Sequence, residues 1–447
     1  MARVRHDRLS AHDATFLYAE SPTTSMNVGG VFVLAPSADG RPPLALTTLT
    51  ELLEPRLHLV PRLRQRLLEV PLHAGFPVWV DDPAFTLDHH LQHAALTTAA
   101  TWPDVLDLMA RLQAGRLRRD RPLWDMFLAE QVADGTAVLF LRAHHALVDG
   151  MSAIRLIQTI FATQQQAVPP WTPPALPSSR RLLAAALTQR PTRQPKAKPG
   201  LVKSSAPLLK MPPPRRGPFN VTVGQDRRLV TFEMPSAEAR SLARRFDGTL
   251  QDVALTVVAG AIARLPTNRK RRRRKALRTV IPVAEAVPQR QLRLGNHAAF
   301  FVVDLPVGCI DESERFDLIR LATAAAKDAG QAQAIARFIH AGERVPAPVY
   351  AAAVPLAART SSTNLLVTFM RGPRNPMTIG GATLRAAYAS LPLGRRLALL
   401  AGILDMGGIM AFSFTADPHA VPDVELLPSN CAAVLHELQG PSGTQQP

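Results

Sequence analysis

The chain has 447 residues, more than one ordinary hydrophobic core holds, so its length predicts two domains. An apolar content of 47% excludes a disordered protein, and no uncharged apolar run reaches the roughly 20 residues of a membrane span. The formal charge of +17 favours acidic partners, but an aromatic content of 5% argues against nucleic acid, because single-stranded nucleic acid is bound by stacking on aromatic rings.

Short helices and strands alternate in the first half of the chain. Ser10, followed three residues later by Asp13, has the pattern of a helix cap, and Asp134-Gly135 has the pattern of a hairpin turn. The predicted elements are, in chain order, a helix after Ser10, a strand at 28–34, a helix at 46–54 stopped by Pro55, a strand and turn within 76–91, a helix at 104–117, and a hairpin that joins 126–132 to 137–143.

Residues 166–217 differ from the rest of the chain in composition. They include twelve prolines and ten Lys or Arg, but no Asp or Glu, and only 181–188 could form a helix. Such a composition cannot bury a core, so the segment is predicted to be an interdomain linker, with contact to anionic lipid headgroups as the alternative. The predicted domains are therefore 1–165 and 218–447.

The second half again mixes strands and helices. The predicted elements are a strand at 228–232, a helix at 236–246, an apolar helix at 249–265, strands at 277–283, 300–305, 365–370 and 411–415, and a terminal helix at 423–439. The basic run at 269–275 is predicted to be an exposed loop; a localisation signal, a nucleic-acid patch and a phosphate-steering site are the alternatives. No repeated βαβ rhythm and no dinucleotide fingerprint is present, so each half is expected to be a mixed α/β unit.

The cellular compartment is indicated by the N-terminus and the cysteines. The first residues are charged and no apolar stretch follows them, so no signal peptide is predicted. Cys309 and Cys431 are too few for a disulfide framework or a metal site, and structural thiols in a reducing cytoplasm are expected. Any membrane contact is expected to be peripheral.

One motif carries the chemistry. The apolar run 136–143, typical of a buried strand, leads into His144 and His145, and Asp149 and Gly150 follow four and five residues after His145, ahead of a helical pattern. His145 is therefore expected where a strand ends and a helix begins, a common place for chemistry in α/β proteins. A pair of core histidines is the alternative interpretation, but the complete motif at a strand end is far more specific.

Other catalytic classes lack their signatures. The chain has no Gly-x-Ser-x-Gly motif of serine hydrolases, and neither His89-His90 nor His144-His145 has metal-ligand spacing, so no metal is predicted. A histidine acting alone as general base remains, because a neutral imidazole can take a proton from a hydroxyl and return it. This chemistry suits acyl transfer from a thioester to an alcohol without a covalent intermediate. Asp149 is expected to hold the loop through Arg or backbone groups.

Several motifs together resemble one enzyme family. The segment 144–150 resembles the active-site motif of chloramphenicol acetyltransferase-like CoA-dependent acyltransferases, and the remainder resembles the bacterial wax ester synthase/acyl-CoA:diacylglycerol acyltransferases. The further matching motifs lie at 8–10, 20–24, 28–30, 121–124, 294–296, 304–306 and 421–423.

The resemblance implies an architecture and a set of site residues. It implies two chloramphenicol acetyltransferase-like domains, each a mixed sheet with flanking helices, and a tunnel between them in which acyl-CoA and the acceptor meet. His145 would be the base, with His144 and Asp149 as support. The implied substrate-binding residues are Gly150, Pro122, Leu123, Trp124, Gly295, Asn296, Gln251, Asp252 and Thr368. On residue types alone, 122–124 could equally be a core turn, and Thr368 could be an oxyanion donor or simple strand packing.

Departures from the family pattern bear on the acceptor. Gln251-Asp252 stands where the family has Asn-Asp, Ala284 lies in a stretch where the family has serine, and 368–373 replaces Ser-Asn-Val-Pro-Gly-Pro. An amide and a hydroxyl expected near the tunnel are thus replaced.

The leading hypothesis is transfer of a long-chain acyl group from CoA to diacylglycerol, which makes triacylglycerol. Acyl-CoA is a substrate in this reaction, and no cofactor is expected. Wax ester synthesis on long-chain alcohols is the alternative acyl transfer. A divergent member that binds lipid or acyl-CoA with little turnover is a second alternative. A cytoplasmic location is expected, with peripheral contact to the inner face of the plasma membrane or to lipid droplets, and no nucleic-acid partner.

Overall fold

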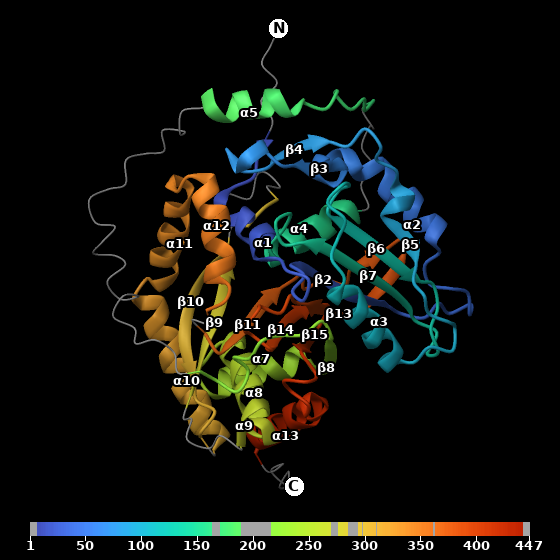
Figure 1. The fold of residues 1–447 in the computed structure, drawn as a ribbon. Coiled ribbons are helices and arrows are strands. Elements are labelled where there is room, and N and C mark those ends of the chain that lie inside the picture. Colours follow the sequence, from blue (N-terminus) through green and yellow to red (C-terminus); the bar gives the residue numbers. More distant parts are fainter. Residues whose placement is uncertain are drawn as a thin grey trace.

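The computed structural model describes residues 7–162, 170–188, 216–269, 276–284, 294–296, 298–309, 311–360 and 363–440. Within these residues the chain forms two six-stranded mixed sheets, a small three-stranded sheet and flanking helices (Figure 1). The predicted mixed α/β class is therefore confirmed. Most of the predicted linker and of the basic run, including 270–275, lies outside the described residues.

The first large sheet carries the histidine motif on a central strand. Its order is β12 (Thr378–Ile379), β13 (Ala382–Ser390), β2 (Asn27–Leu34), β7 (Ala137–His144), β6 (Trp124–Ala129) and β5 (Leu91–His93). Every pairing in it is antiparallel except that of β5 with β6. β7 is completely buried apart from Arg142, because its apolar run lies between two neighbouring strands.

The second large sheet belongs to the other half of the chain. Its order is β10 (Ala298–Leu305), β9 (Leu277–Ala284), β11 (Leu365–Arg371), β14 (Leu399–Met406), β15 (Ile409–Ala416) and β8 (Arg228–Pro235). β14 and β15 form a hairpin that turns at Gly407 and Gly408, both with positive φ. Both strands of this apolar hairpin are buried along most of their length.

One feature of the sheet topology was not predicted from the sequence, namely that two strands of the second half of the chain join the first sheet. β12 and β13 come from the second half of the chain but complete the first sheet, where β13 pairs with β2 (Figure 1). A buried apolar cluster that includes Tyr388 of β13 and Leu229 of β8 continues this contact between the halves. The boundaries 1–165 and 218–447 remain a prediction, but this exchange of strands ties the two parts together.

The helices surround these sheets. They are α1 (Ala11–Ala19), α2 (Leu46–Leu53), α3 (Trp102–Ala114), α4 (Gly150–Ile160), α5 (Ser179–Thr188), α7 (Ser236–Arg245), α8 (Leu250–Ala263), α9 (Pro266–Arg269), α10 (Glu312–Asp328), α11 (Gln331–Ala341), α12 (Ala347–Ala357) and α13 (Leu427–Gln439). α8 is the buried apolar helix that was predicted, and it contacts α7, α10 and α13. No single described helix is long and apolar enough to cross a membrane; α7 and α8 meet that test only as a pair bent by 97°.

Local signals placed several elements correctly. Ser10 caps α1 by accepting a hydrogen bond from the backbone N–H of Asp13, and α2 ends directly before Pro55 in a 3-10 turn. Within the predicted linker, α5 packs Leu182 against Val78 and Val80 of the small sheet β1 (Asp7–Arg8), β4 (Val78–Asp81) and β3 (Gln65–Leu68). α10, α11 and α12 were not predicted.

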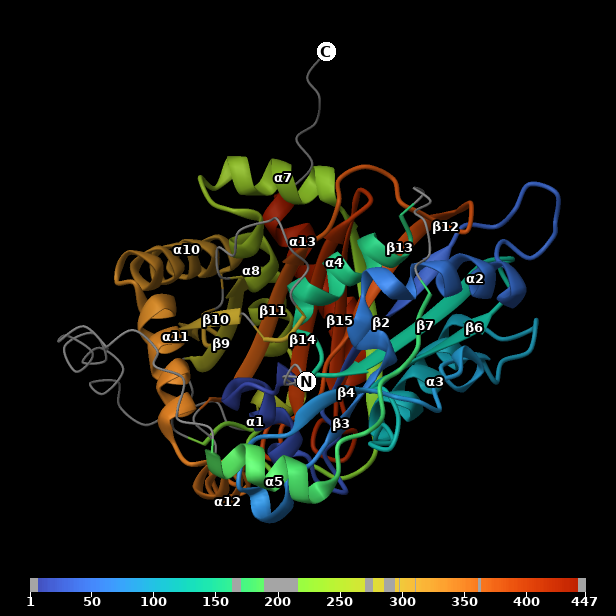
Figure 2. The same ribbon diagram turned by 90° about the horizontal axis from the view of Figure 1, so that it is seen from above.

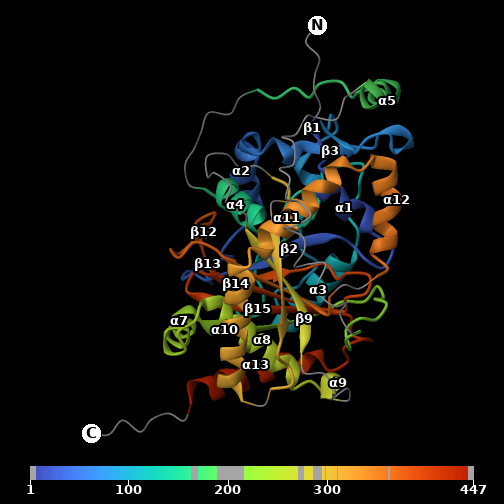
Figure 3. The same cartoon turned by 90° about the vertical axis from the view of Figure 1, so that its left-hand side faces the viewer.

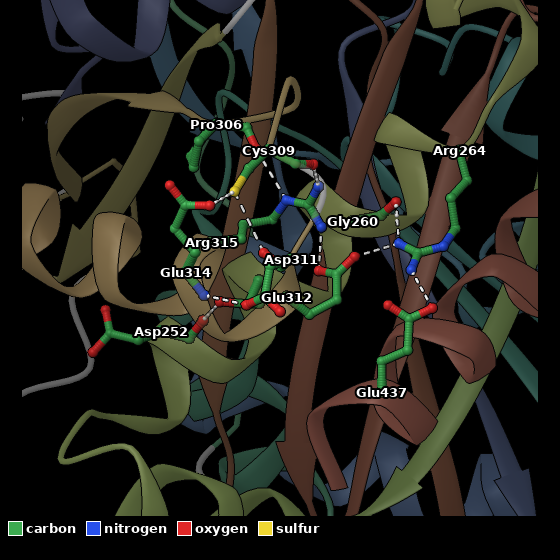
Figure 4. Close-up of polar contacts among 11 residues, drawn as sticks. Asp252, Gly260, Arg264, Pro306, Cys309, Asp311, Glu312, Glu314, Arg315 and Glu437 are labelled. Carbon is green, nitrogen blue, oxygen red and sulfur yellow. Dashed lines mark hydrogen bonds and ion pairs between the residues drawn. The ribbon is translucent and has the colours of Figure 1, made fainter. Parts of the chain in front are cut away.

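A buried charged network fixes the start of α10 (Figure 4). The guanidinium of Arg315, almost fully buried, donates to the backbone carbonyl oxygens of Pro306 (2.9 Å) and Cys309 and pairs with Glu312. Arg264 of α8 joins Glu312 to Glu437 of α13. The guanidinium of Arg264 thereby connects α8, α10 and α13.

Candidate active site

The histidine motif lies at a strand-to-helix junction, as predicted. β7 ends at His144, and α4 begins at Gly150. Asp149 caps α4: its Oδ1 accepts a 2.7 Å hydrogen bond from the backbone N–H of Ser152. A Cβ atom at Gly150 would overlap the sulfur of Met370 on β11, so glycine permits the close approach of the second half of the chain.

His144 faces the interior of the protein rather than the reaction space. Its Nδ1 accepts a 3.0 Å hydrogen bond from the backbone N–H of Ala146, so the neutral ring carries its proton on Nε2, which lies 3.6 Å from Oε1 of Glu20. Burial lowers the pKa of His144. Burial by itself would raise the pKa of Glu20, but its contacts with His144 and Arg119 hold that pKa below its ordinary value. A neutral His144 therefore lies against an ionised Glu20 and orients the turn.

The imidazole of His145 is buried and stacks on an aromatic ring. Its ring stacks on Phe16 of α1, with centroids 3.9 Å apart and planes within 5°, and its backbone N–H donates to the carbonyl oxygen of Met26. Nδ1 is buried without a hydrogen-bond partner among the described residues. Burial lowers the pKa of His145 to about 4, against the opposing effects of its own backbone carbonyl and of Asp149. The imidazole is therefore neutral near pH 7 and can accept a proton.

The second half of the chain docks directly on this turn. The side-chain amide of Asn296 donates to the backbone carbonyl oxygen of His145 (2.7 Å) and to Oδ1 of Asp13 (2.7 Å). Gly295 pairs with Val148 and adopts a φ of 120°, a region that favours glycine. Asp13, read from the sequence as part of a local cap, thus also anchors a loop 283 residues away.

A large cavity lies between the two halves of the chain at His145. Its volume is about 1270 Å³, which is above the roughly 300–1,000 Å³ of common small-molecule sites. Its walls come from α1, β2, β7 and α4 in the first half of the chain and from α8, β9, β11, α11, α12 and β13 in the second half, and they are mostly apolar. Such a space accommodates a large apolar ligand.

Six of the predicted site residues line this cavity. They are His145, Asp149, Gly150, Gln251, Asn296 and Thr368. The hydroxyl of Thr368 is buried and has no hydrogen-bond partner among the described residues, as expected of a group that awaits a ligand. The remaining predicted residues, His144, Pro122, Leu123, Trp124, Gly295 and Asp252, are not among the lining residues.

Residues 122–124 and Asp252 lie outside the cavity lining and make contacts within the fold, so their assignment to substrate binding stays a prediction. Leu123 accepts a backbone hydrogen bond from His144, and the indole of Trp124 donates to the carbonyl oxygen of Leu63. Asp252 completes the capping box of α8 with Thr249 and accepts a 2.7 Å hydrogen bond from the Thr323 hydroxyl. Gln251, the preceding residue of the helix, lines the cavity.

Three cavity residues were not identified from the sequence. Phe16 stacks on His145, His12 lies one helical turn before Phe16, and Ser390 of β13 has a buried hydroxyl without a partner among the described residues. His12 and Phe16 are four residues apart on α1, a spacing that puts both on one face. No local signal identifies Ser390, because β13 reaches the site only through the strand exchange. No group of three or more His, Cys, Asp or Glu that could hold a metal is found in the described ranges.

The lowered pKa of His145 predicts that kcat/KM depends on pH in a range below that of an ordinary histidine. A histidine that serves as general base acts in its neutral form, above its pKa, and the pH dependence of kcat/KM reports that pKa in the free protein. With that pKa lowered to about 4, kcat/KM is expected to stay constant from neutral pH to about pH 5 and to fall only below that. A midpoint near the ordinary histidine value of about 6.5 would contradict this.

The control for this profile is the stability of the fold. Because the folded pKa lies below the unfolded one, the protein loses stability as pH falls from about 6.5 toward 4. Far-ultraviolet circular dichroism at each pH separates protonation of His145 from unfolding.

The chain is similar to known proteins along most of its length. The model of the wax ester synthase/diacylglycerol acyltransferase catalytic domain matches residues 9–254, and that of the C-terminal domain of the same proteins matches 294–439. A protein of Mycobacterium tuberculosis, named as a probable diacylglycerol O-acyltransferase, is 27% identical over 438 residues, which cover 93% of this chain and 92% of the relative.

Solved structures share the fold. The wax ester synthase/diacylglycerol acyltransferase from Marinobacter aquaeolei VT8 superposes with a TM-score of 0.71 at 22% identity, over 97% of this chain and 98% of that one. The first condensation domain of the calcium-dependent antibiotic synthetase gives 0.64 at 15% identity, over 99% and 98%. The predicted chloramphenicol acetyltransferase-like architecture is thereby confirmed.

Proposed function

The chain belongs to the wax ester synthase/diacylglycerol acyltransferase family, and on this basis we propose that it transfers a long-chain acyl group from acyl-CoA to diacylglycerol. The observation that carries the proposal is the neutral imidazole of His145, which faces a large apolar cavity shared by both halves of the chain. The name of the mycobacterial relative supports diacylglycerol as acceptor. The size and apolar walls of the cavity suit long-chain substrates.

His145 would act as the general base. Its neutral imidazole would take the proton from the acceptor hydroxyl. The hydroxyl oxygen attacks the thioester carbonyl carbon as its proton moves to the imidazole. The tetrahedral intermediate then collapses, the carbon–sulfur bond breaks, and the CoA thiolate takes the proton back from the imidazolium. No covalent enzyme intermediate and no cofactor is required.

The oxyanion of the tetrahedral intermediate needs hydrogen-bond donors. The Thr368 hydroxyl is suited to this role, since it lines the cavity and is buried without a partner among the described residues. Asn296 and Asp149 would act by positioning, because each bonds to the backbone of residues 145–152.

An acceptor screen tests the proposal. The purified protein is incubated with palmitoyl-CoA and either dioleoylglycerol, hexadecanol or no acceptor, while release of the CoA thiol is followed and the lipid products are separated. Acceptor-dependent thiol release with triacylglycerol as the main product is expected. Faster release with hexadecanol would instead identify a wax ester synthase. Tight palmitoyl-CoA binding without release for any acceptor would indicate a binding protein.

The location follows from the substrate. Diacylglycerol resides in lipid, so a cytoplasmic enzyme that uses it would work in peripheral contact with an anionic membrane or a lipid droplet. The excess of basic residues in the chain supports such contact.

A further inference from the structure

α12 is an apolar helix that faces solvent. Its eleven residues include no charged side chain, yet only Ala347 is buried. Val349 is 56% exposed and Leu356 59%, and their seven-residue spacing places them on one face of the helix. A surface helix of a water-soluble protein normally has a polar outer face, so this stripe indicates contact with something apolar.

Further exposed apolar side chains gather beside α12. The short 3-10 helix η3 (Pro71–His73) contacts both α12 and α5, and it exposes 84% of Leu72. α5 exposes 73% of Leu187. Figures 1 and 2 show α5 and α12 in the same region of the molecule, with α5 above the end of α12 in Figure 1. We call Leu72, Leu187, Val349 and Leu356 the apolar face.

Basic residues surround the apolar face. Arg180 and Arg181 lie on α5, and Arg344 and Arg359 lie on either side of α12; all four are exposed and form no ion pair with another described residue. Neither α5 nor α12 contains Asp or Glu. An apolar centre with a cationic rim is the pattern that binds anionic lipid surfaces, because the headgroups meet the rim while the centre enters the acyl region. A second copy of the chain would bring like charges together at this face.

The inner side of the same helices lines the cavity. The Tyr350 hydroxyl of α12 lies 2.7 Å from the Thr15 hydroxyl of α1, and Tyr350 and Ala353 line the space that contains His145. Phe338 of α11 is also part of that lining but is 70% exposed, so the cavity opens to solvent there. Figure 3 views the molecule from this side, with α11 and α12 toward the viewer.

We infer that the apolar face docks on an anionic phospholipid surface and that the acceptor reaches the cavity from this surface between α11 and α12. The identity of the acceptor in this inference rests on the proposed function, whereas the docking does not. α12 would lie at the interface plane, with Val349 and Leu356 in the lipid and Tyr350 toward the active site. The path from lipid to His145 would then avoid water.

Vesicle sedimentation tests the docking without any acyl-CoA. Wild-type protein is expected to sediment with vesicles of phosphatidylcholine and phosphatidylglycerol and much less with phosphatidylcholine alone. Val349→Glu/Leu356→Glu is expected to weaken binding by roughly tenfold or more, because two apolar side chains no longer enter the lipid. The matched control is Leu318→Glu/Leu321→Glu, which changes two exposed leucines of α10. This control is expected to bind as the wild type does.

Turnover assays with two forms of the acceptor distinguish an effect on docking from an effect on catalysis. With a short-chain diacylglycerol dissolved in water, Val349→Glu/Leu356→Glu is expected to match the wild type, whereas with dioleoylglycerol in anionic vesicles it loses turnover in proportion to binding. Wild-type protein that binds anionic vesicles but releases no CoA thiol with either diacylglycerol would count against the proposed function alone.

Three results would overturn the docking inference. In the first, the wild-type protein does not sediment with anionic vesicles. In the second, Val349→Glu/Leu356→Glu binds the vesicles as tightly as the wild type does. In the third, light scattering shows that the wild type is a dimer and that Val349→Glu/Leu356→Glu is a monomer. The last would mean that a second copy covers this face. Circular dichroism of each variant confirms that it is folded.

Discussion

Replacing His145 by alanine is expected to lower kcat by about 10²–10⁴-fold with little change in the fold, because the substitution removes the proposed general base. The imidazole stacks on Phe16 and its Nδ1 has no partner among the described residues, so its loss leaves no buried polar group stranded. Steady-state release of CoA thiol from palmitoyl-CoA in the presence of the preferred acceptor measures the effect. Equal product from variant and wild type would refute the mechanism.

The matched control is His12→Ala. His12 lines the same cavity and contacts the same Phe16, with ring centroids 5.8 Å apart, so its removal changes the cavity in a similar way without removing the proposed base. Turnover is expected to fall far less than in His145→Ala. A loss of equal size would indicate that cavity shape, rather than proton transfer at His145, limits the reaction.

Replacing Arg315 by alanine is expected to lower the free energy of unfolding by about 3–5 kcal/mol, because it breaks a buried ion pair and leaves charge and carbonyl groups uncompensated. Arg315 is almost fully buried and bonds to Pro306, Cys309 and Glu312 (Figure 4). Urea denaturation followed by circular dichroism measures the change. At this magnitude much of the stability of a typical domain is lost, so low folded yield is also expected.

The control for Arg315 lies on the same helix. Arg320 pairs with Asp317 at 3.7 Å with both side chains partly exposed, and exposed pairs contribute only about 0–1 kcal/mol. Arg320→Ala is therefore expected to unfold close to the wild-type urea concentration. Similar losses of unfolding free energy in both variants would show that the buried ion pairs of Arg315 contribute no more than an exposed pair.

The sequence by itself determined the features that depend on neighbours along the chain. The cap of α1 at Ser10, the end of α2 before Pro55 and the turn at Gly135 follow from interactions over a few residues, which a local pattern records. The junction of β7 and α4 was predictable for the same reason. An apolar run of strand type, followed by Asp149 as a cap and a helical repeat, specifies where His145 lies.

Only the tertiary structure decided what surrounds His145. The Asn296 amide joins Asp13 to the backbone of His145 across 283 and 151 residues of chain, and β13 brings Ser390 to the cavity by crossing to the first sheet. Gln251 reaches the cavity while its neighbour Asp252 caps α8, a difference set by the direction of each side chain on a packed helix.

The exposure of the apolar helix α12 was likewise decided by the tertiary structure. An apolar composition is typical of a buried helix, but packing against α1 leaves one side of α12 exposed beside the cavity. Local propensity and capping act within a turn or two of backbone, and so the sequence reports them directly. The environment of a catalytic residue depends on which distant segments pack against it, and that is settled by the burial of the whole chain.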